Sequence, residues 1–197
     1  MARGLVFVWS VLTVLGLPGR AEEDYVSAES LREAGLRKSW QLSLRLAADQ
    51  RLVDMYLVDD QLYLATSDGY VYALHGPTGA TRWLRQVTAE GYRVRRPVHV
   101  GERVIFATPT TVLQLNALSG EGLHKMPLDF PAGTGPVTDG VRFFLGGLDR
   151  RMHAFDVQEP LFGWELVANG PIQSAPAVQG ENLYFACLLY TSPSPRD

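Results

Sequence analysis

The chain has 197 residues, 46% of them hydrophobic, which is enough to build a packed core and excludes bulk disorder. Its 18 Lys and Arg against 21 Asp and Glu give a net charge of −3, which argues against a nucleic-acid partner. The single cysteine, Cys187, excludes an intrachain disulfide, so stability must come from the core.

Residues 1–21 have the features of a cleaved secretory signal. Arg3 supplies a positive start, and the apolar run at 5–17 is too short to span the ~30 Å of a bilayer core as a helix. Gly19 and Ala21 are small residues suited to cleavage after Ala21, and no cysteine follows for a lipid anchor. We therefore predict an exported chain, periplasmic or extracellular, with no transmembrane span after cleavage. Cleavage removes two arginines and no acid, so the net charge becomes −5.

Residues 22–38 form a polar segment in which we predict one short helix. Ser30 is suited to be its N-cap, with Glu33 at capping-box spacing, and the helix is expected to run through Leu36. Residues 40–44 then alternate large apolar with polar side chains, which predicts a half-buried strand.

A unit that recurs about every forty residues begins near residue 52. Its clearest copy has a turn at Asp68-Gly69 between two predicted strands at 62–66 and 70–74. Residues 75–79 are dense in turn formers, and Trp83 opens a further short strand. The unit is therefore an antiparallel meander.

The later copies share this plan. Each has a proline, a short strand, a glycine turn and an apolar strand that ends in a small residue, at 97–107, 136–146 and 176–186. The third strand recurs at 71–75, 112–116 and 152–156, and the fourth is marked by Trp40, Trp83, residues 125–126 and Trp164. We predict repeats at about 52–90, 94–130, 134–170 and, truncated, 174–186.

Four short antiparallel strands in ~40–45 residues are typical of a β-propeller blade. We therefore predict an all-β fold over residues 39–186, an incomplete ring of about three and a half four-stranded blades. Residues 187–197 place two prolines in a Ser/Thr cluster, where the next turn and strand are expected. This segment resembles translated sequencing adapter, and we predict that it is a non-native tail.

The first copy resembles the repeat of the pyrroloquinoline-quinone-like β-propellers. The family's blade has a Gly, a strand ending in Ala-Leu-Asp, a Thr-Gly turn and a Trp; this chain has Gly69, Ala73-Leu74, Thr78-Gly79 and Trp83. The match is weaker in the second copy, where Ser119-Gly120 replaces Thr-Gly and the Trp is absent. The residues that we assign to this structural motif are Asp68, Gly69, Ala73, Leu74, Thr78, Gly79, Trp83, Asp149, Ala154, Asp156 and Trp164.

This resemblance implies a fold but leaves two functions open. The first is an exported, non-enzymatic binding or scaffold module in the cell envelope, with a protein or envelope-polymer partner and no cofactor. The alternative is the N-terminal part of a quinone-dependent dehydrogenase, whose pyrroloquinoline quinone and Ca²⁺ site would lie in further blades. The vicinal cysteine pair and calcium-ligand cluster of those dehydrogenases are not found in this sequence. A third reading is a sensor or stalk domain of a larger exported protein.

The polar residues of the repeat have ordinary structural interpretations. His75, His99, His124 and His153 are dispersed, so turn capping and strand packing are favoured over a metal site. Asp149 and Asp156 are interpreted as turn residues rather than an acid–base pair. We expect Trp83 and Trp164 to dock between blades. The basic residues Arg82, Arg85, Arg93, Arg95 and Arg96 suit a solvated loop or an anionic partner, and Arg150-Arg151 an exposed turn.

Overall fold

The computed structural model describes residues 26–159 and 162–188, so the predicted signal sequence lies outside the described residues. The chain divides into two units, Met1–Lys38 and Ser39–Asp197, which are described separately. Within the described ranges, no helix is both long and apolar enough to cross a membrane.

The described part of the first unit, residues 26–38, contains one short helix, α1 (Ala28–Glu33). The predicted N-cap Ser30 is wrong: Ser27 is the cap, and its hydroxyl accepts a hydrogen bond from the backbone N–H of Ser30 at 3.1 Å. The expected extension to Leu36 is also wrong, because Gly35 adopts a left-handed φ of +70° directly after the last turn. All of the helix is solvent-accessible, and none of its residues is buried.

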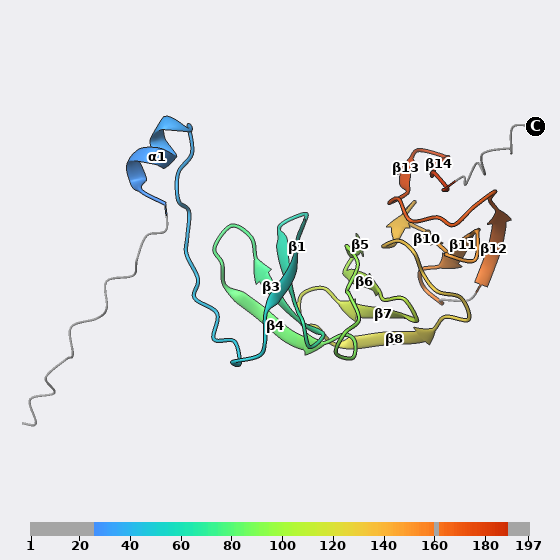
Figure 1. Cartoon of the computed structure of the whole chain (residues 1–197), viewed down its shortest axis with the longest axis horizontal. Helices are drawn as coiled ribbons and strands as arrows, with labels where there is room; N and C mark the ends of the chain where they lie inside the picture. Colours follow the sequence, from blue (N-terminus) through green and yellow to red (C-terminus); the bar gives the residue numbers. More distant parts are fainter. Residues whose placement is uncertain (1–25, 160–161, 189–197) are drawn as a thin grey trace, which may run out of the picture. The chain divides into compact units, whose positions relative to one another are not determined.

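The second unit consists of successive antiparallel sheets, as predicted (Figure 1). In the described residues, three sheets have four strands each, in the order of the chain, and a fourth sheet has two. The first contains β1 (Leu52–Val58), β2 (Gln61–Thr66), β3 (Tyr70–His75) and β4 (Thr81–Gln86). The second contains β5 (Val98–Val100), β6 (Arg103–Ala107), β7 (Thr111–Asn116) and β8 (Gly122–Pro127). The third contains β9 (Val137–Thr138), β10 (Arg142–Gly146), β11 (Arg151–Asp156) and β12 (Phe162–Val167), and the fourth β13 (Ala177–Gln179) and β14 (Asn182–Tyr184).

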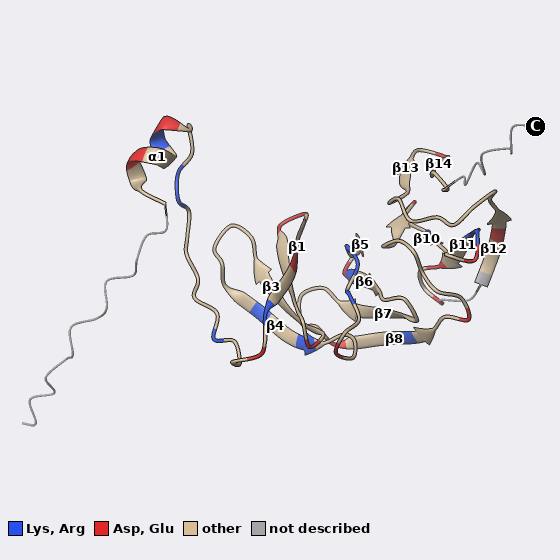
Figure 2. Cartoon of the chain, viewed as in Figure 1, with Lys and Arg blue, Asp and Glu red and all other residues tan. Residues whose placement is uncertain are grey.

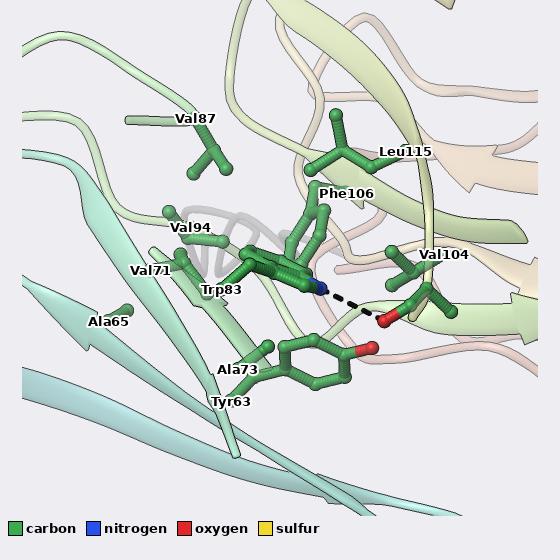
Figure 3. Close-up of a cluster of buried hydrophobic side chains, with 11 residues drawn as sticks. Tyr63, Ala65, Val71, Ala73, Trp83, Val87, Val94, Val104, Phe106 and Leu115 are labelled. Carbon is green, nitrogen blue, oxygen red and sulfur yellow. Dashed lines mark hydrogen bonds between the residues drawn. The ribbon is translucent and has the colours of Figure 1, made fainter. Parts of the chain in front are cut away.

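These sheets are the blades of a β-propeller, and we number them one to four in chain order. In blades one to three the second and third strands are the most buried, because their side chains pack against neighbouring blades. Tyr63 and Trp83 of blade one pack with Val104 and Phe106 of blade two in one apolar cluster, drawn in Figure 3. Further clusters join blade two to blade three and blade three to blade four. The core is therefore divided among the interfaces between blades.

The predicted strand at 40–44 is absent from the structure, which assigns no strand before β1 in the described residues. The side chain of Trp40 nevertheless packs onto blade one. Its indole N–H donates to the carbonyl of Gly76 at 2.6 Å, and a Cβ added to Gly79 would lie 2.6 Å from its ring. Alternation of apolar residues alone does not make a strand where no neighbouring strand supplies hydrogen bonds.

The first two residues of the predicted tail contact the preceding blades. Cys187 is partly buried against the cluster of Phe144, Met152 and Ile172. The backbone N–H of Leu188 donates to the carbonyl of Pro171 at 3.0 Å. Residues 189–197 lie outside the described part of the chain.

Candidate functional site

Equivalent positions of the blades can be compared directly, because the strands of each blade have matching registers. Where all blades carry similar side chains, the fold explains the residue. Where one blade departs from the others, another explanation is needed. Two groups of residues depart in this way: one joins blades one and two, and the other lies in the groove between blades two and three.

The first group is a hydrogen-bonded chain of Asp59, His99 and Tyr63. Nδ1 of His99 lies 2.8 Å from Oδ2 of Asp59, and Nε2 lies 2.7 Å from the hydroxyl of Tyr63. The same hydroxyl is 3.1 Å from Oε1 of Gln61. The phenol carries a single proton, so it donates either to Oε1 of Gln61 or to Nε2 of His99, and its oxygen accepts from any further donor.

The backbone at Asp59 shows that this chain of contacts is not required by the repeat. Asp59 has φ +52°, and the equivalent turn positions in blades two and four are Gly101 and Gly180, both at +58°. A non-glycine residue at positive φ is disfavoured, although Asp tolerates it better than most. Asp59 therefore stands at a backbone position that glycine would occupy at a lower conformational cost.

The order carboxylate, imidazole, hydroxyl is also that of a nucleophilic relay. Here the hydroxyl is inaccessible: Tyr63 is 1% exposed and the side chain of His99 11%. Burial also raises the pKa of Tyr63 well above its usual value, so the phenol stays neutral near pH 7. The arrangement cannot present a nucleophile to a substrate, and we interpret it as a polar clasp between the first two blades.

In the described residues an open groove lies between each pair of successive blades; the one between blades three and four is lined by Asp139, Arg142, Trp164 and Glu181, among others. The other two occupy equivalent places in the repeat. The first, between blades one and two, has a volume of about 460 Å³, and we call it the basic groove. Its charged side chains are Arg85 and Lys125, with Leu113, Leu115 and the hydroxyls of three threonines around them. Figure 2 shows the basic residues of β4 and β8 in blue.

The second groove, between blades two and three, has a volume of about 520 Å³, and we call it the acidic groove. Its lining residues are Met126, Pro127, Leu128, Asp129, Phe130, Asp149, Arg151, His153, Phe155 and Glu165. Three of these are acidic and one is arginine. The two grooves thus have the same place in the repeat and opposite charge.

The registers identify the pair of positions that reverses the charge. In blade two Leu113 faces Lys125 across β7 and β8, and in blade three His153 faces Glu165 across β11 and β12. Figure 2 shows the acidic residue on β12 in red. Each pair occupies the same register position of its blade, so blade geometry does not dictate either charge.

His153 forms the floor of the acidic groove. Its ring stacks on Phe130, with centroids 3.5 Å apart and planes 8° from parallel. Nε2 lies 3.0 Å from Oδ2 of Asp149, and Nδ1 lies 3.9 Å from Oε2 of Glu165. Both ring nitrogens therefore face carboxylates, and the His153 side chain is 5% exposed.

The motif residues of blade one are placed as the repeat requires. Gly69 has φ +84°, and an added Cβ would lie 2.2 Å from the carbonyl oxygen of Thr88. Ala73 and Leu74 are fully buried. Asp68 accepts hydrogen bonds from the Thr66 hydroxyl at 2.6 Å and from Gln50, which hold the pKa of its carboxyl below the usual value. These positions serve the turn and the core.

The two tryptophans expected to dock between blades differ. Trp83 is buried, its indole N–H donates to the carbonyl of Ala117 at 2.9 Å, and a Cβ on Gly120 would lie 2.7 Å from its ring (Figure 3). Trp40 makes the same pair of contacts to Gly76 and the Thr78-Gly79 turn. Trp164 is instead 36% exposed and packs at a tilt on Phe144 of its own blade.

The remaining polar residues lie mostly in turns. His75 contacts the Thr78 hydroxyl at 2.8 Å, and Asp156 accepts from the backbone of Gln158 at 2.7 Å. His124 is exposed. Ala154 is fully buried, whereas Arg150 is exposed and occupies a left-handed turn position at φ +69°. Asp149 hydrogen-bonds to His153 rather than forming a pair with Asp156.

The five other arginines do not form one shared patch. Arg82 faces Asp60 at 3.7 Å, and Arg93 faces Asp54 at 3.5 Å. Arg96 donates to the carbonyl of Leu57 at 2.9 Å. In the described ranges, no group of three or more His, Cys, Asp or Glu side chains is arranged to hold a metal ion.

Sequence reasoning missed the polar clasp and both grooves. Aligning the copies position by position reveals two of the departures. His99 stands where blade three has Thr138, and Tyr63 stands where blade two has Ile105. The contacts themselves join residues 36 and 40 positions apart, so only the packing of two blades brings them together.

No family model and no curated protein matches this sequence. Solved structures match its fold, and the chain spans about two fifths of the length of two of them. BamB from Moraxella catarrhalis is 23% identical over 68% of this chain and 39% of its own, with a TM-score of 0.57. The Neurospora crassa Pan2 WD40 domain is 16% identical over 62% of this chain and 39% of its own, with a TM-score of 0.53. The designed protein Ika4 is 10% identical over 72% of this chain and 88% of its own, with a TM-score of 0.57. At these identities the likeness shows the fold alone, which is that of a β-propeller.

Proposed function

We propose that this chain belongs to an exported, non-enzymatic β-propeller of the pyrroloquinoline-quinone-like kind, which binds a protein partner in the cell envelope. Export rests on the signal features of residues 1–21, and the kind of propeller on the Thr78-Gly79 turn and Trp83. The partner contacts the side of the blades, where the basic and acidic grooves open.

The opposite charge of the two grooves is the observation that carries this proposal. Arg85 and Lys125 charge one groove, and Asp149 and Glu165 the other. Blade geometry leaves the charge free at Lys125 and Glu165, whereas Asp149 also accepts from the backbone N–H of Arg151 in the turn before β11. Charges that the fold does not need are available for recognition, where they steer association and suppress wrong partners. A protein surface with both acidic and basic side chains matches this pattern.

Site-specific photo-crosslinking in cells that export the full chain tests the proposal. A photoreactive phenylalanine analogue replaces Thr110 at the basic groove or Pro127 at the acidic groove, and Ser119 in an exposed turn of blade two serves as the control. We expect one protein to crosslink from both grooves, not from Ser119, and to be lost after Lys125→Glu. Equal adducts from all three positions, or none, would refute the proposal.

A further inference from the structure

We propose that the acidic groove binds the guanidinium of an arginine in an extended segment of the partner. This inference rests on the proposed function as a binding module and names the chemistry of one contact. The occupant follows from the charge, the shape and the apolar lining of the groove.

Two of the three carboxylates of the groove lie beside the same imidazole ring. Asp149 and Glu165 come from the turn before β11 and from β12, and both face the buried ring of His153. Each remains partly open to solvent, at 22% and 38% side-chain exposure. A carboxylate has about four lone-pair positions. Asp149 also accepts from the backbone N–H of Arg151 at 3.2 Å, and Glu165 faces the Arg151 side chain at 3.5 Å, so each carboxylate keeps further acceptor positions.

A guanidinium already lies beside one of these carboxylates. Nε of Arg151 is 3.5 Å from Oε1 of Glu165, and its side chain is 47% exposed. The distance marks a loose ion pair rather than a short charge-assisted hydrogen bond, which measures about 2.7–2.9 Å. Arg151 thus shows that the groove accommodates a guanidinium at Glu165, and it competes with an incoming one.

The lining favours arginine over other cations. Met126, Leu128, Phe130 and Phe155 supply an apolar wall against which the methylene stem of a long side chain can pack. A planar guanidinium presents several donors in one plane and reaches two carboxylates, whereas an ammonium is a compact, strongly hydrated charge. The groove fits a side chain that is apolar along its length and planar at its tip.

The basic groove is an internal comparison. It has the same place in the repeat but carries Lys125 where the acidic groove carries Glu165, and no carboxylate is among its lining residues. An arginine would meet like charge there. Of these two grooves, only the acidic one is therefore expected to bind arginine.

Titration of the full chain with the peptide acetyl-Leu-Arg-Leu-amide, followed by NMR or calorimetry, tests this assignment. The matched peptides replace arginine with citrulline, which is isosteric and uncharged, or with lysine. Glu165→Gln should weaken binding of the arginine peptide about fivefold. Arg151→Gln should tighten it about threefold, because the resident competitor is removed. Glu121→Gln, in an exposed turn outside the groove, should change nothing.

The opposite signs expected for Glu165→Gln and Arg151→Gln separate recognition from damage to the fold, which would weaken binding in both. Equal binding of the arginine and citrulline peptides would overturn the inference, and equal binding of the lysine peptide would overturn the choice of guanidinium. Either result leaves the crosslinking outcome standing, so failure here is distinguishable from failure of the proposed function.

Discussion

The strongest test of the blade packing is the truncation of Trp83, compared with the equivalent Trp164. Both stand opposite a fully buried alanine of the third strand, Ala73 or Ala154. Trp83 is 7% exposed and donates a hydrogen bond across the interface, whereas Trp164 is 36% exposed. The same substitution therefore removes an interface contact in one blade and a half-exposed side chain in the other.

Trp83→Ala should lower the free energy of unfolding by about 3–5 kcal/mol, the usual cost of removing a buried aromatic side chain. Trp83→Phe should cost about 1–3 kcal/mol, because it keeps an aromatic ring but leaves the buried carbonyl of Ala117 without its donor. Trp164→Ala should cost less than half as much as Trp83→Ala. Urea unfolding of the full-length variants, followed by circular dichroism, measures all three. Equal losses for the two alanine variants would refute the interpretation of Trp83 as the residue that locks blade one onto blade two.

Three further predictions concern the turns and the polar clasp. Gly120→Ala should destabilise the chain by about 2 kcal/mol more than Gly101→Ala. Both glycines have positive φ, but only at Gly120 would an added Cβ lie 2.7 Å from Trp83. Equal melting temperatures of the two variants would contradict this. Tyr63→Phe should cost about 1–3 kcal/mol at pH 8, because it removes the buried hydroxyl that contacts both Nε2 of His99 and Oε1 of Gln61. Burial raises the pKa of Tyr63 in the folded chain above that in the unfolded chain, which is near 10. The contribution of its hydroxyl to folding stability is therefore complete below pH 10 and is lost as the pH rises above it. The difference between wild type and Tyr63→Phe in urea titrations should therefore shrink above pH 10, by about 1.4 kcal/mol per pH unit, and a constant difference would contradict the reasoning. For Asp139, burial alone would raise the pKa, but hydrogen bonds from the backbone N–H groups of Arg142 and Val141 and the charge of Arg142 together lower it. The contribution of the Asp139 carboxylate to folding stability is thus present above the unfolded pKa of about 4 and is lost as the pH falls through the lower folded pKa. Asp139→Asn should therefore be destabilising at pH 7 and neutral near pH 2. A difference in stability from wild type that persists at pH 2 would contradict this prediction.

The strands could be predicted from sequence because the repeat displays each one several times. A β-propeller places both faces of its middle strands in contact with neighbours, so their apolar runs stand out, and the prolines and glycine turns mark the strands before them. The predicted third strands match β3, β7 and β11 to within one residue. Periodicity was sufficient here since every copy obeys the same packing constraint.

The errors came where a local pattern had no repeat to support it. Ser27 and Ser30 are both followed at three residues by a polar partner, and sequence alone does not decide which begins the helix. Residues 40–44 have a strand pattern, but strands need neighbours to pair with. Only Trp40, through its contact with Gly79, behaves as the repeat predicts.

The candidate sites were hidden for the opposite reason. Asp59, His99 and His153 look like ordinary turn or strand residues when each is considered within its own blade. Their roles depend on the adjacent blade or strand: His99 meets Tyr63 of blade one, and His153 stacks on Phe130, which follows β8. The sequence of a repeat protein predicts contacts within each blade well, because every blade repeats them. It predicts contacts between blades poorly, because these depend on how the copies differ.

Differences between copies therefore separate what the fold requires from what it merely permits. Glycine suffices at the turn that holds Asp59, and Lys125 is tolerated at the place of Glu165. Neither acid is needed to build a blade, yet each contacts a histidine that is also absent from the equivalent blade position. Each of these pairs is therefore a departure from the repeat that blade geometry does not explain. For Asp59 and His99 the pair ends in a buried hydroxyl, so it stabilises an interface. For Glu165 and His153 it lies in an open groove, and that exposure makes the acidic groove, rather than the clasp, the place to look for a partner.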